Sequence, residues 1–169
     1  AIEPGAPESA PEVIVYVDYQ CPACAQFESL FGEPLAQMAR DGDIRLSQTT
    51  MTFMDRNIGN DSSTRSAKAA VCADQAGIYP AFNTAVFANQ SPSHDGYPED
   101  LLRNQLPTQL GLKGEKLTQF QQCVDGRLGE QFVEGMNKSA YEAGVTSTPT
   151  ITVNGKPLEN GTITNVDVL

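Results

Sequence analysis

The fold of this chain is decided by Val13-Ile14-Val15-Tyr16-Val17, which is followed closely by Cys21-Pro22-Ala23-Cys24. The first run is apolar and mostly β-branched, which predicts a buried strand. After the cysteines, residues 25–31 carry apolar side chains at helical spacing. The cysteines therefore lie where a strand ends and a helix begins. The free N–H groups and positive dipole end of a helix stabilise a thiolate there, and Pro22 suits a first helical turn.

Cys21 and Cys24 are close enough in the sequence for their sulfur atoms to bond. We interpret the pair as a redox dithiol whose first thiol has a lowered pKa. The alternative is half of a zinc site, which needs a further pair of cysteine or histidine ligands. Cys72 and Cys123 are isolated, and the single histidine, His94, lies in an expected loop. We therefore predict no metal site and no bound cofactor.

The composition excludes several classes of function. The chain has 169 residues, 40% hydrophobic and 19% charged, which suits one globular domain with or without an insertion. Its net charge of −10 argues against nucleic acid and anionic lipid as partners. The sequence contains no run of 18 apolar residues, so no membrane-spanning helix is predicted. Residues 1–12 form a Pro-rich spacer without a basic residue, as expected after removal of a signal or anchor.

Helix and strand patterns alternate along the rest of the chain. A helix is predicted over 22–40 with a kink at Pro34, followed by a strand over 44–54. Residues 61–144 are mainly helix formers, which predicts four or five helices without an intervening strand. The breaks between these helices are expected at 77–80, 91–98, 111–114 and 126.

A β-hairpin is predicted near the end of the chain. Thr150-Ile151-Thr152-Val153 reads as a strand, and Asn154-Gly155 is a strong signal for a tight hairpin turn. Thr148-Pro149 stands at the entry of this strand, where a proline removes no ladder hydrogen bond. From the sequence alone the Thr148–Pro149 bond is expected to be trans, since cis bonds are uncommon even before proline.

Cys72 and Cys123 each lie in a segment with a helical pattern, so both can face a shared core. One interpretation is that they are two small buried hydrophobic residues that never bond. The other, which we prefer, is a structural disulfide that joins two helices and indicates an oxidising compartment. In the chain-entropy model a loop of about 50 residues makes such a bond worth about 4 kcal/mol.

Taken together, these features resemble the DsbA-like branch of the thioredoxin superfamily. The resemblance rests on the Cys21-Pro22-Ala23-Cys24 unit, the helical block and the Thr148-Pro149 strand, and it covers Val13 to Leu158. The segment Asp18-Tyr19-Gln20-Cys21 is similar to the active-site segment of Gram-positive, particularly actinobacterial, members. A CPxC motif combined with a downstream Thr-Pro beside a hairpin is much more specific than either signal alone.

The resemblance implies an α/β fold and assigns roles to the motif. A thioredoxin-like domain is expected over 13–57 and 144–169, interrupted by an inserted helical domain over 58–143. Cys21 would be the exposed nucleophile and Cys24 its buried resolving partner. Family members work outside the cytoplasm and introduce disulfides into exported, unfolded proteins. A membrane protein similar to DsbB or to vitamin K epoxide reductase would reoxidise the dithiol, and we expect a monomer.

The resemblance also implies roles for residues outside the motif. Thr148-Pro149 would match the cis-proline loop, which lies against the dithiol and pairs its backbone with an extended substrate. Some actinobacterial members carry a second disulfide in the helical region, which supports a Cys72–Cys123 bond.

This chain departs from the family pattern at three places. Many members have His at the position of Ala23, so Cys21 is expected to depend on helix-terminal N–H groups for stabilisation of its thiolate. Thioredoxin-like proteins often have a buried acid at the position of Val15. A closing helix normally follows the hairpin, and residues 165–169 reach only its expected beginning.

Several nearby residues have a functional and a simpler interpretation. Glu28 shares a helix face with Cys24 and could move its proton, but a solvated surface carboxylate is the preferred interpretation, as it is for Asp18. The aromatic residues could line an apolar groove, although core packing explains them equally well; they are Tyr19, Phe27 and Phe31.

Two other classes of function stay open at this point. A reductase or disulfide isomerase on the same fold would keep the dithiol reduced, and its reduction potential would separate it from an oxidase. A structural or metal-binding module would use Cys21 and Cys24 as ligands, and metal analysis with thiol counting would identify it.

Overall fold

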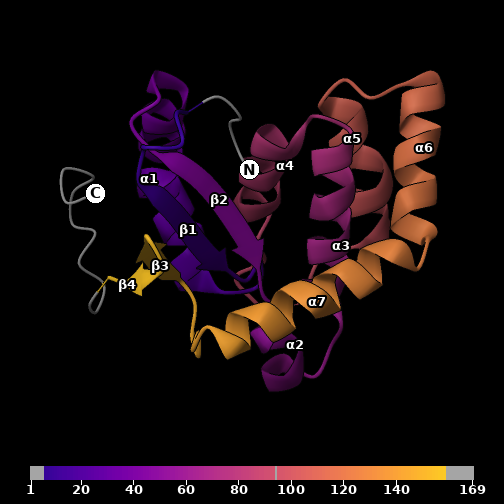
Figure 1. Ribbon diagram of the computed structural model, residues 1–169. Helices are drawn as coiled ribbons and strands as arrows, with labels where there is room; N and C mark the ends of the chain where they lie inside the picture. Colours follow the sequence, from indigo (N-terminus) through magenta and orange to yellow (C-terminus); the bar gives the residue numbers. More distant parts are fainter. Residues whose placement is uncertain (1–5, 94, 159–169) are drawn as a thin grey trace.

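The computed structural model describes residues 6–93 and 95–158, so the expectations for His94 and for 165–169 lie outside the described residues. A mixed sheet stands beside a group of helices (Figure 1). Its four strands have the order β2-β1-β3-β4, with β1 parallel to β2 and antiparallel to β3. The strands are β1 Glu12–Val17, β2 Arg45–Thr50, β3 Thr150–Val153 and β4 Lys156–Pro157. The predicted α/β class is confirmed.

Helices form most of the remaining described chain. They are α1 Pro22–Asp41, α2 Phe53–Ile58, α3 Ser62–Gln75, α4 Tyr79–Ala88, the π-helical turn η1 Leu101–Gln105, α5 Leu106–Gln109, α6 Gly114–Asp125 and α7 Leu128–Glu142. Helices α3 to α6 stand beside the sheet, and α7 runs back from α6 toward it (Figure 1). The predicted helical block is confirmed, because no strand interrupts residues 61–144 where the structure describes them. The breaks lie close to the predicted positions, except that 79–80 already belong to α4.

The strand predicted over 44–54 is too long, because it ends at Thr50 and α2 follows. Contacts with distant residues hold the start of α2. The N–H of Thr52 donates to the side chain of Asn137 in α7 at 3.1 Å, and the N–H of Met54 donates to Asp18 at 2.9 Å. These side-chain acceptors bind the N–H groups that a longer strand would pair with a neighbouring strand. The β-propensity of residues 51–54 is therefore overridden by tertiary contacts.

Helix α1 has clear signals at both ends. Cys21 is its N-cap residue in an extended conformation, and Pro22 occupies the first helical position. The helix continues through Pro34 and ends at Gly42, whose φ of 84° lies in the left-handed region that favours glycine. The dithiol therefore lies at the first turn of one long helix, as predicted.

The hairpin between β3 and β4 follows directly from its turn residues. Asn154 has a φ of 49° and Gly155 a φ of 75°, so both central residues are left-handed, as a type I′ turn requires. The predicted hairpin is confirmed. It holds β3 against β1, which brings Thr148-Pro149 to the same end of the sheet as the dithiol.

Each face of β1 is covered by a different helix. Val15 on one face belongs to the main buried cluster together with Leu35 of α1. Tyr16 on the other face packs in a smaller cluster with Ala140 of α7. The strand is therefore buried on both sides, as its continuous apolar run predicts.

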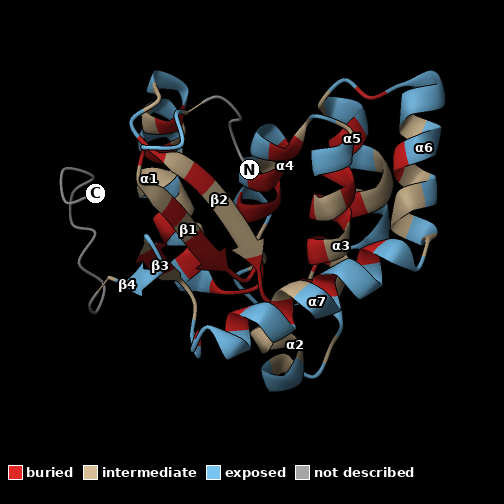
Figure 2. Ribbon diagram, in the orientation of Figure 1, coloured by how far each residue is buried: buried red, intermediate tan, exposed pale blue. Residues whose placement is uncertain are grey.

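The sheet and the helical block share one core. The main buried cluster extends from the valines of β1 through α1 to Phe82 of α4 and Phe120 of α6, and buried positions line the facing sides of both units (Figure 2). The boundaries placed at 58 and 143 stay a prediction. Within the described residues, no helix combines the length and the apolar character needed to cross a membrane.

Candidate active site

Cys21 and Cys24 lie at the start of α1 as free thiols. Cys24 is 0% exposed and Cys21 is 8% exposed. Cys21 is thus the more accessible sulfur, but the expectation that it is openly exposed is wrong. The loop that carries Thr148 lies against it, with the carbonyl oxygen of Thr148 3.5 Å from Cys21 Sγ, a hydrogen bond that Cys21 donates only while its thiol is protonated.

The two thiols have opposite pKa shifts. The pKa of Cys21 is lowered to about 5, first because the Cys24 thiol donates a hydrogen bond to its sulfur. The N–H groups of Cys24 and Ala23 at the start of the helix also favour its thiolate. Burial raises the pKa of Cys24, and the hydrogen bond to Cys21 raises it further. At neutral pH the pair therefore holds one negative charge, on Cys21.

Pro22 and Ala23 lie between the cysteines and are both exposed. Ala23 offers no side-chain donor, but the side chain of Thr148 supplies a hydrogen bond that lowers the pKa of Cys21. Helix-terminal N–H groups alone were expected to stabilise the thiolate. The structure adds the Cys24 thiol and Thr148 to that set.

Thr148-Pro149 comes directly before β3 and is half-buried. The Thr148–Pro149 peptide bond is cis, so the expectation from the sequence alone is wrong, whereas the geometry agrees with what the family resemblance implies. The Thr148 carbonyl lies within hydrogen-bonding distance of Cys21 Sγ. The sheet thus brings together two motifs that are 127 residues apart.

Asp18 is 0% exposed, so the expectation of a solvated carboxylate is wrong. Its own N–H donates to Cys24 Sγ at 3.5 Å. Its carboxylate accepts from the N–H of Gln20 at 2.9 Å, the N–H of Met54 at 2.9 Å and the hydroxyl of Ser63 at 2.6 Å. Burial outweighs these hydrogen bonds and raises the pKa of Asp18 to about 6. A buried acid therefore lies beside the dithiol, although the position of Val15 carries none.

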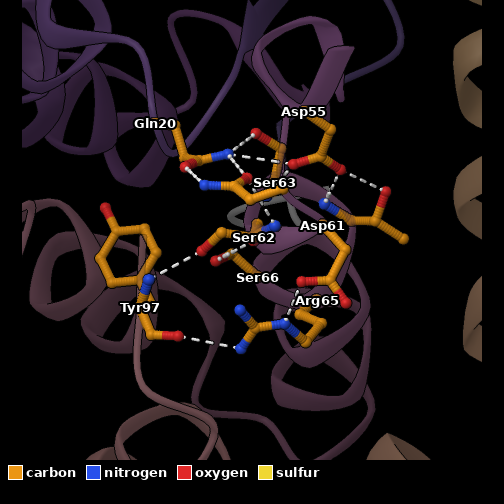
Figure 3. A network of polar contacts seen from close by, with 10 residues as sticks. Gln20, Asp55, Asp61, Ser62, Ser63, Arg65, Ser66 and Tyr97 are labelled. Carbon is orange, nitrogen blue, oxygen red and sulfur yellow. Dashed lines mark hydrogen bonds and ion pairs between the residues drawn. The ribbon is translucent and has the colours of Figure 1, made fainter. Parts of the chain in front are cut away.

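Residues 18–21 form the loop between β1 and α1, which we call the dithiol loop. The side chain of Gln20 anchors this loop to the helical block (Figure 3). Its amide group donates to Asp55 at 3.0 Å, to Asn60 at 2.9 Å and to Ser63 at 2.9 Å. Asp55 in turn accepts from the N–H of Ser63 and from the N–H and hydroxyl of Thr64 at the start of α3. The first turn of α3 and the loop before Cys21 are thus parts of one polar network.

Two residues that follow α4 reach the backbone of the same loop. Gln90 Nε2 donates to the carbonyl of Tyr19 at 2.7 Å and to the carbonyl of Cys21 at 3.1 Å. The Tyr97 hydroxyl donates to the Tyr19 carbonyl at 2.7 Å. The N–H of Tyr97 is itself held by Ser62 of α3 at 2.7 Å (Figure 3). The helical block therefore binds the peptide of the nucleophile directly.

Glu28 is half-buried, so the expectation of a solvated carboxylate is wrong here as well. The Thr84 hydroxyl donates to it at 2.8 Å, and burial raises its pKa. Glu28 therefore bridges α1 and α4. The nearby aromatic residues pack against one another, since Tyr19 lies 4.8 Å from Phe87 and Phe27 lies 5.3 Å from Phe31, between ring centroids. Phe27 also lines an apolar cavity between α1 and α4, so both interpretations hold for this residue.

Cys72 and Cys123 form a disulfide with an S–S distance of 1.98 Å and a Cα–Cα distance of 5.8 Å. The bond joins α3 to α6 across 51 residues of sequence. Cys72 is buried and Cys123 is partly exposed. Among the residues described, no group of three or more His, Cys, Asp or Glu side chains lies together as a metal site.

Sequence reasoning missed the contacts of Gln20, Ser63, Gln90 and Tyr97 with the dithiol loop. Ser63 lies in α3, and Gln90 and Tyr97 lie in the loop after α4, so none of the three has a recognisable spacing from the cysteines. Gln90, for example, is 69 residues from Cys21. Only Gln20 carried a signal, because it stands next to the motif.

Comparison with known proteins places the chain in a family. A family model described as thioredoxin matches residues 2–167. Among curated proteins no match was found.

Several solved structures share the fold. MdbA, a thiol-disulfide oxidoreductase from Corynebacterium diphtheriae, is 22% identical with a TM-score of 0.80, over 94% of this chain and 82% of that one. Reduced DsbA from Mycobacterium tuberculosis is 26% identical with a TM-score of 0.74, over 94% and 79%. Oxidised BdbD from Bacillus subtilis is 22% identical with a TM-score of 0.75, over 92% and 82%.

These similarities agree with the geometry of the site. A model that covers nearly the whole chain shows the family, and the solved structures share both the mixed sheet and the helical block. The cysteine pair at the start of α1 and the cis-proline beside it lie at the meeting point of these two parts. The chain belongs to the thioredoxin family, as a DsbA-like thiol-disulfide oxidoreductase.

Proposed function

We propose that this protein works outside the cytoplasm and introduces disulfides into exported, unfolded proteins by exchange at Cys21 and Cys24. The observation that carries the proposal is the position of Cys21 at the start of α1, where the Cys24 thiol and backbone N–H groups lower its pKa to about 5. A stabilised thiolate favours the reduced form of the pair, so the Cys21–Cys24 disulfide is a strong oxidant.

The reaction has two exchange steps. A substrate thiolate attacks Cys21 Sγ, the Cys21–Cys24 bond breaks, and Cys24 leaves with the electron pair and takes up a proton. A second substrate thiolate then attacks the substrate sulfur of the mixed disulfide, and Cys21 leaves as a thiolate. The substrate loses two electrons and gains a disulfide, while the Cys21–Cys24 pair becomes reduced. The low pKa of Cys21 makes it a good leaving group in the second step.

Residues around the dithiol support distinct tasks in this reaction. Cys21 is the sulfur with some exposure, which suits the nucleophile, and the fully buried Cys24 suits the resolving partner. The segment Thr148-Pro149 lies against Cys21 and leads into β3. An extended substrate would pair its backbone with this segment, as in strand addition. Exposed Pro22 and Ala23 would face the same substrate.

The disulfide between Cys72 and Cys123 supports a location outside the cytoplasm, since structural disulfides persist in oxidising compartments. Each catalytic cycle leaves two electrons on the Cys21–Cys24 pair, so turnover needs an electron acceptor. We propose a membrane protein similar to DsbB or to vitamin K epoxide reductase as that acceptor. The protein itself would act as a monomer.

A redox titration against glutathione tests this function. Because the chain has no tryptophan, thiol trapping and mass spectrometry would report the state of each cysteine. A potential near about −120 mV, the range of strong oxidants, is expected. A value near about −270 mV would make the protein a reductase. Failure of Cys21 and Cys24 to bond would favour a structural or metal-binding use of the two thiols.

A further inference from the structure

The backbone around Cys21 has a set of hydrogen bonds that the exchange reaction does not by itself require. The Cys21 carbonyl accepts the N–H groups of Cys24 at 3.1 Å and Ala25 at 3.2 Å, which begin α1. Gln90 Nε2 is a third donor to this same oxygen at 3.1 Å. The orientation of the first peptide of α1 is therefore set partly from outside the helix.

Gln90 is well placed to hold this peptide. It follows the last turn of α4, and its own N–H donates to the carbonyl of Phe87 at 3.1 Å. The ring of Phe87 packs against Tyr19 in the dithiol loop at 4.8 Å. The Gln90 side chain then binds the carbonyls of Tyr19 and Cys21 together. The end of α4 thus meets the dithiol loop through one aromatic contact and one amide that joins two carbonyls.

The orientation of this peptide matters for the chemistry of Cys21. The N–H groups of Ala23 and Cys24 lower the pKa of Cys21, and hydrogen bonds of this kind depend strongly on angle. If the Cys21 carbonyl turns, these N–H groups turn with the first turn of the helix. Ala23 has no side-chain donor that could compensate. The thiolate is therefore more dependent on backbone alignment than it would be with a donor at that position.

We propose that Gln90 is a positioning residue that sets the redox equilibrium of the Cys21–Cys24 pair from the helical block. It acts on the carbonyl of Cys21 and on that of Tyr19, and the structure shows no hydrogen bond from it to either sulfur. Tyr97 assists from the same direction, because its hydroxyl donates to the Tyr19 carbonyl. The inference rests on the proposed redox function of the pair and assigns part of its control to a distant element.

The variants Gln90→Ala and Gln90→Glu test the proposal against Asn89→Ala. Alanine removes the donor without adding charge, whereas glutamate keeps the size of the side chain and replaces its donor with an acceptor. Asn89 is the matched control, because it is an adjacent amide whose side chain bonds only within its own helix end, to the Ala85 carbonyl at 2.8 Å. The measurements are the glutathione equilibrium constant and the Cys21 pKa, read from the ultraviolet absorbance of its thiolate.

We expect Gln90→Ala to make the pair less oxidising by about threefold and Gln90→Glu by about tenfold, the range that one hydrogen bond supports. The Cys21 pKa should rise in both variants, and Asn89→Ala should match the wild type. A Gln90→Ala protein with unchanged equilibrium constant and pKa would overturn the proposal, even if its melting temperature fell. If the wild-type pair never forms a disulfide in the same titration, the proposed function fails first.

Discussion

The two cysteine pairs of this protein lie at opposite ends of helices. Cys21 and Cys24 belong to the first turn of α1, where free N–H groups meet the sulfur. Cys72 and Cys123 belong to the last turns of α3 and α6. A helix C-terminus disfavours negative charge. The same side chain is therefore favoured as a thiolate in one region and disfavoured as a thiolate in the other.

Under the proposed function, this difference lets one protein keep one disulfide while it transfers another. In the proposed reaction, reduction of the Cys21–Cys24 bond releases a stabilised thiolate, which favours transfer of the bond to a substrate. Reduction of the Cys72–Cys123 bond would release thiols without such stabilisation and would also free the two helices that it joins. Helix polarity and sequence separation, rather than the presence of two cysteines, distinguish the redox pair from the structural one.

The largest expected effect is on the rate of disulfide transfer, which should depend on Cys21 and Cys24 but not on Cys72 and Cys123. Cys21→Ser should lower the rate of disulfide transfer to a dithiol peptide by more than about a thousandfold, because no other sulfur can take its place. Cys24→Ser, mixed instead with the oxidised peptide, should accumulate the mixed disulfide that forms when the Cys21 thiolate attacks the peptide disulfide and releases one peptide thiolate, visible by mass spectrometry. The double variant Cys72→Ala/Cys123→Ala is the control and should retain transfer. Full activity in Cys21→Ser would contradict the assignment of the nucleophile.

The second prediction concerns the reduction potentials of the two disulfides in the same protein. During titration with a dithiol reductant, the Cys21–Cys24 bond should open first. The Cys72–Cys123 bond should open at a potential more negative by about 100 mV or more, since structural disulfides resist reduction. Alkylation and peptide mass mapping would assign each bond. Simultaneous opening of both would show that helix polarity does not separate them.

Removal of the Cys72–Cys123 disulfide should lower the free energy of unfolding more than removal of the Cys21–Cys24 pair. Removal of the bond in Cys72→Ala/Cys123→Ala should lower the free energy of unfolding by about 2–4 kcal/mol, because the closed loop spans 51 residues. Urea denaturation of the oxidised proteins would measure the loss. The matched control is Cys21→Ala/Cys24→Ala, whose closed loop is much shorter and whose stability should change less. A larger loss in that control would reverse the comparison.

The buried carboxylate beside the redox pair should make stability depend on pH. The pKa of Asp18 is raised to about 6 in the folded protein, so between about pH 4 and pH 6 the folded state binds more protons than the unfolded state. Its contribution to stability is therefore present at low pH and declines as the pH rises through this window. Asp18→Asn lacks this titration.

We expect the stability advantage of the wild type over Asp18→Asn to shrink by about 2–3 kcal/mol from pH 4 to pH 7. Urea denaturation of the oxidised proteins, in which neither thiol of the Cys21–Cys24 pair titrates, would measure it. Asp41→Asn on the exposed end of α1 is the control. A difference between wild type and Asp18→Asn that stays constant with pH would contradict the raised pKa.

The smallest expected effect is a shift in the redox equilibrium of the Cys21–Cys24 pair when residue 23 is changed. Ala23→His adds a side-chain donor at an exposed position next to Cys21. The pair should become more oxidising by about three- to tenfold, since a cationic or donating neighbour favours the thiolate. The glutathione equilibrium constant measures this change. No change would mean that the Cys24 thiol, Thr148 and the backbone already saturate the Cys21 sulfur.

Local sequence was sufficient for the elements that carry the site. The apolar run of β1, the proline at the start of α1 and Asn154-Gly155 in the hairpin each depend on their immediate neighbours, and all three were predicted. The end of β2 was not, because α2 begins through contacts with Asp18 and Asn137 from elsewhere in the chain. Where a boundary depends on a distant acceptor, local propensity does not locate it.

The sequence by itself determined that a dithiol stands between a strand and a helix, because that arrangement depends on residues 13–31 alone. Only the tertiary structure decided that Asp18 is buried beside it, that Thr148 stabilises its thiolate and that Gln90 holds its first peptide. Ser63 is 45 residues from Asp18, and Thr148 is 127 residues from Cys21. Such contacts form only when the sheet and the helical block close around one core, and no local pattern encodes them.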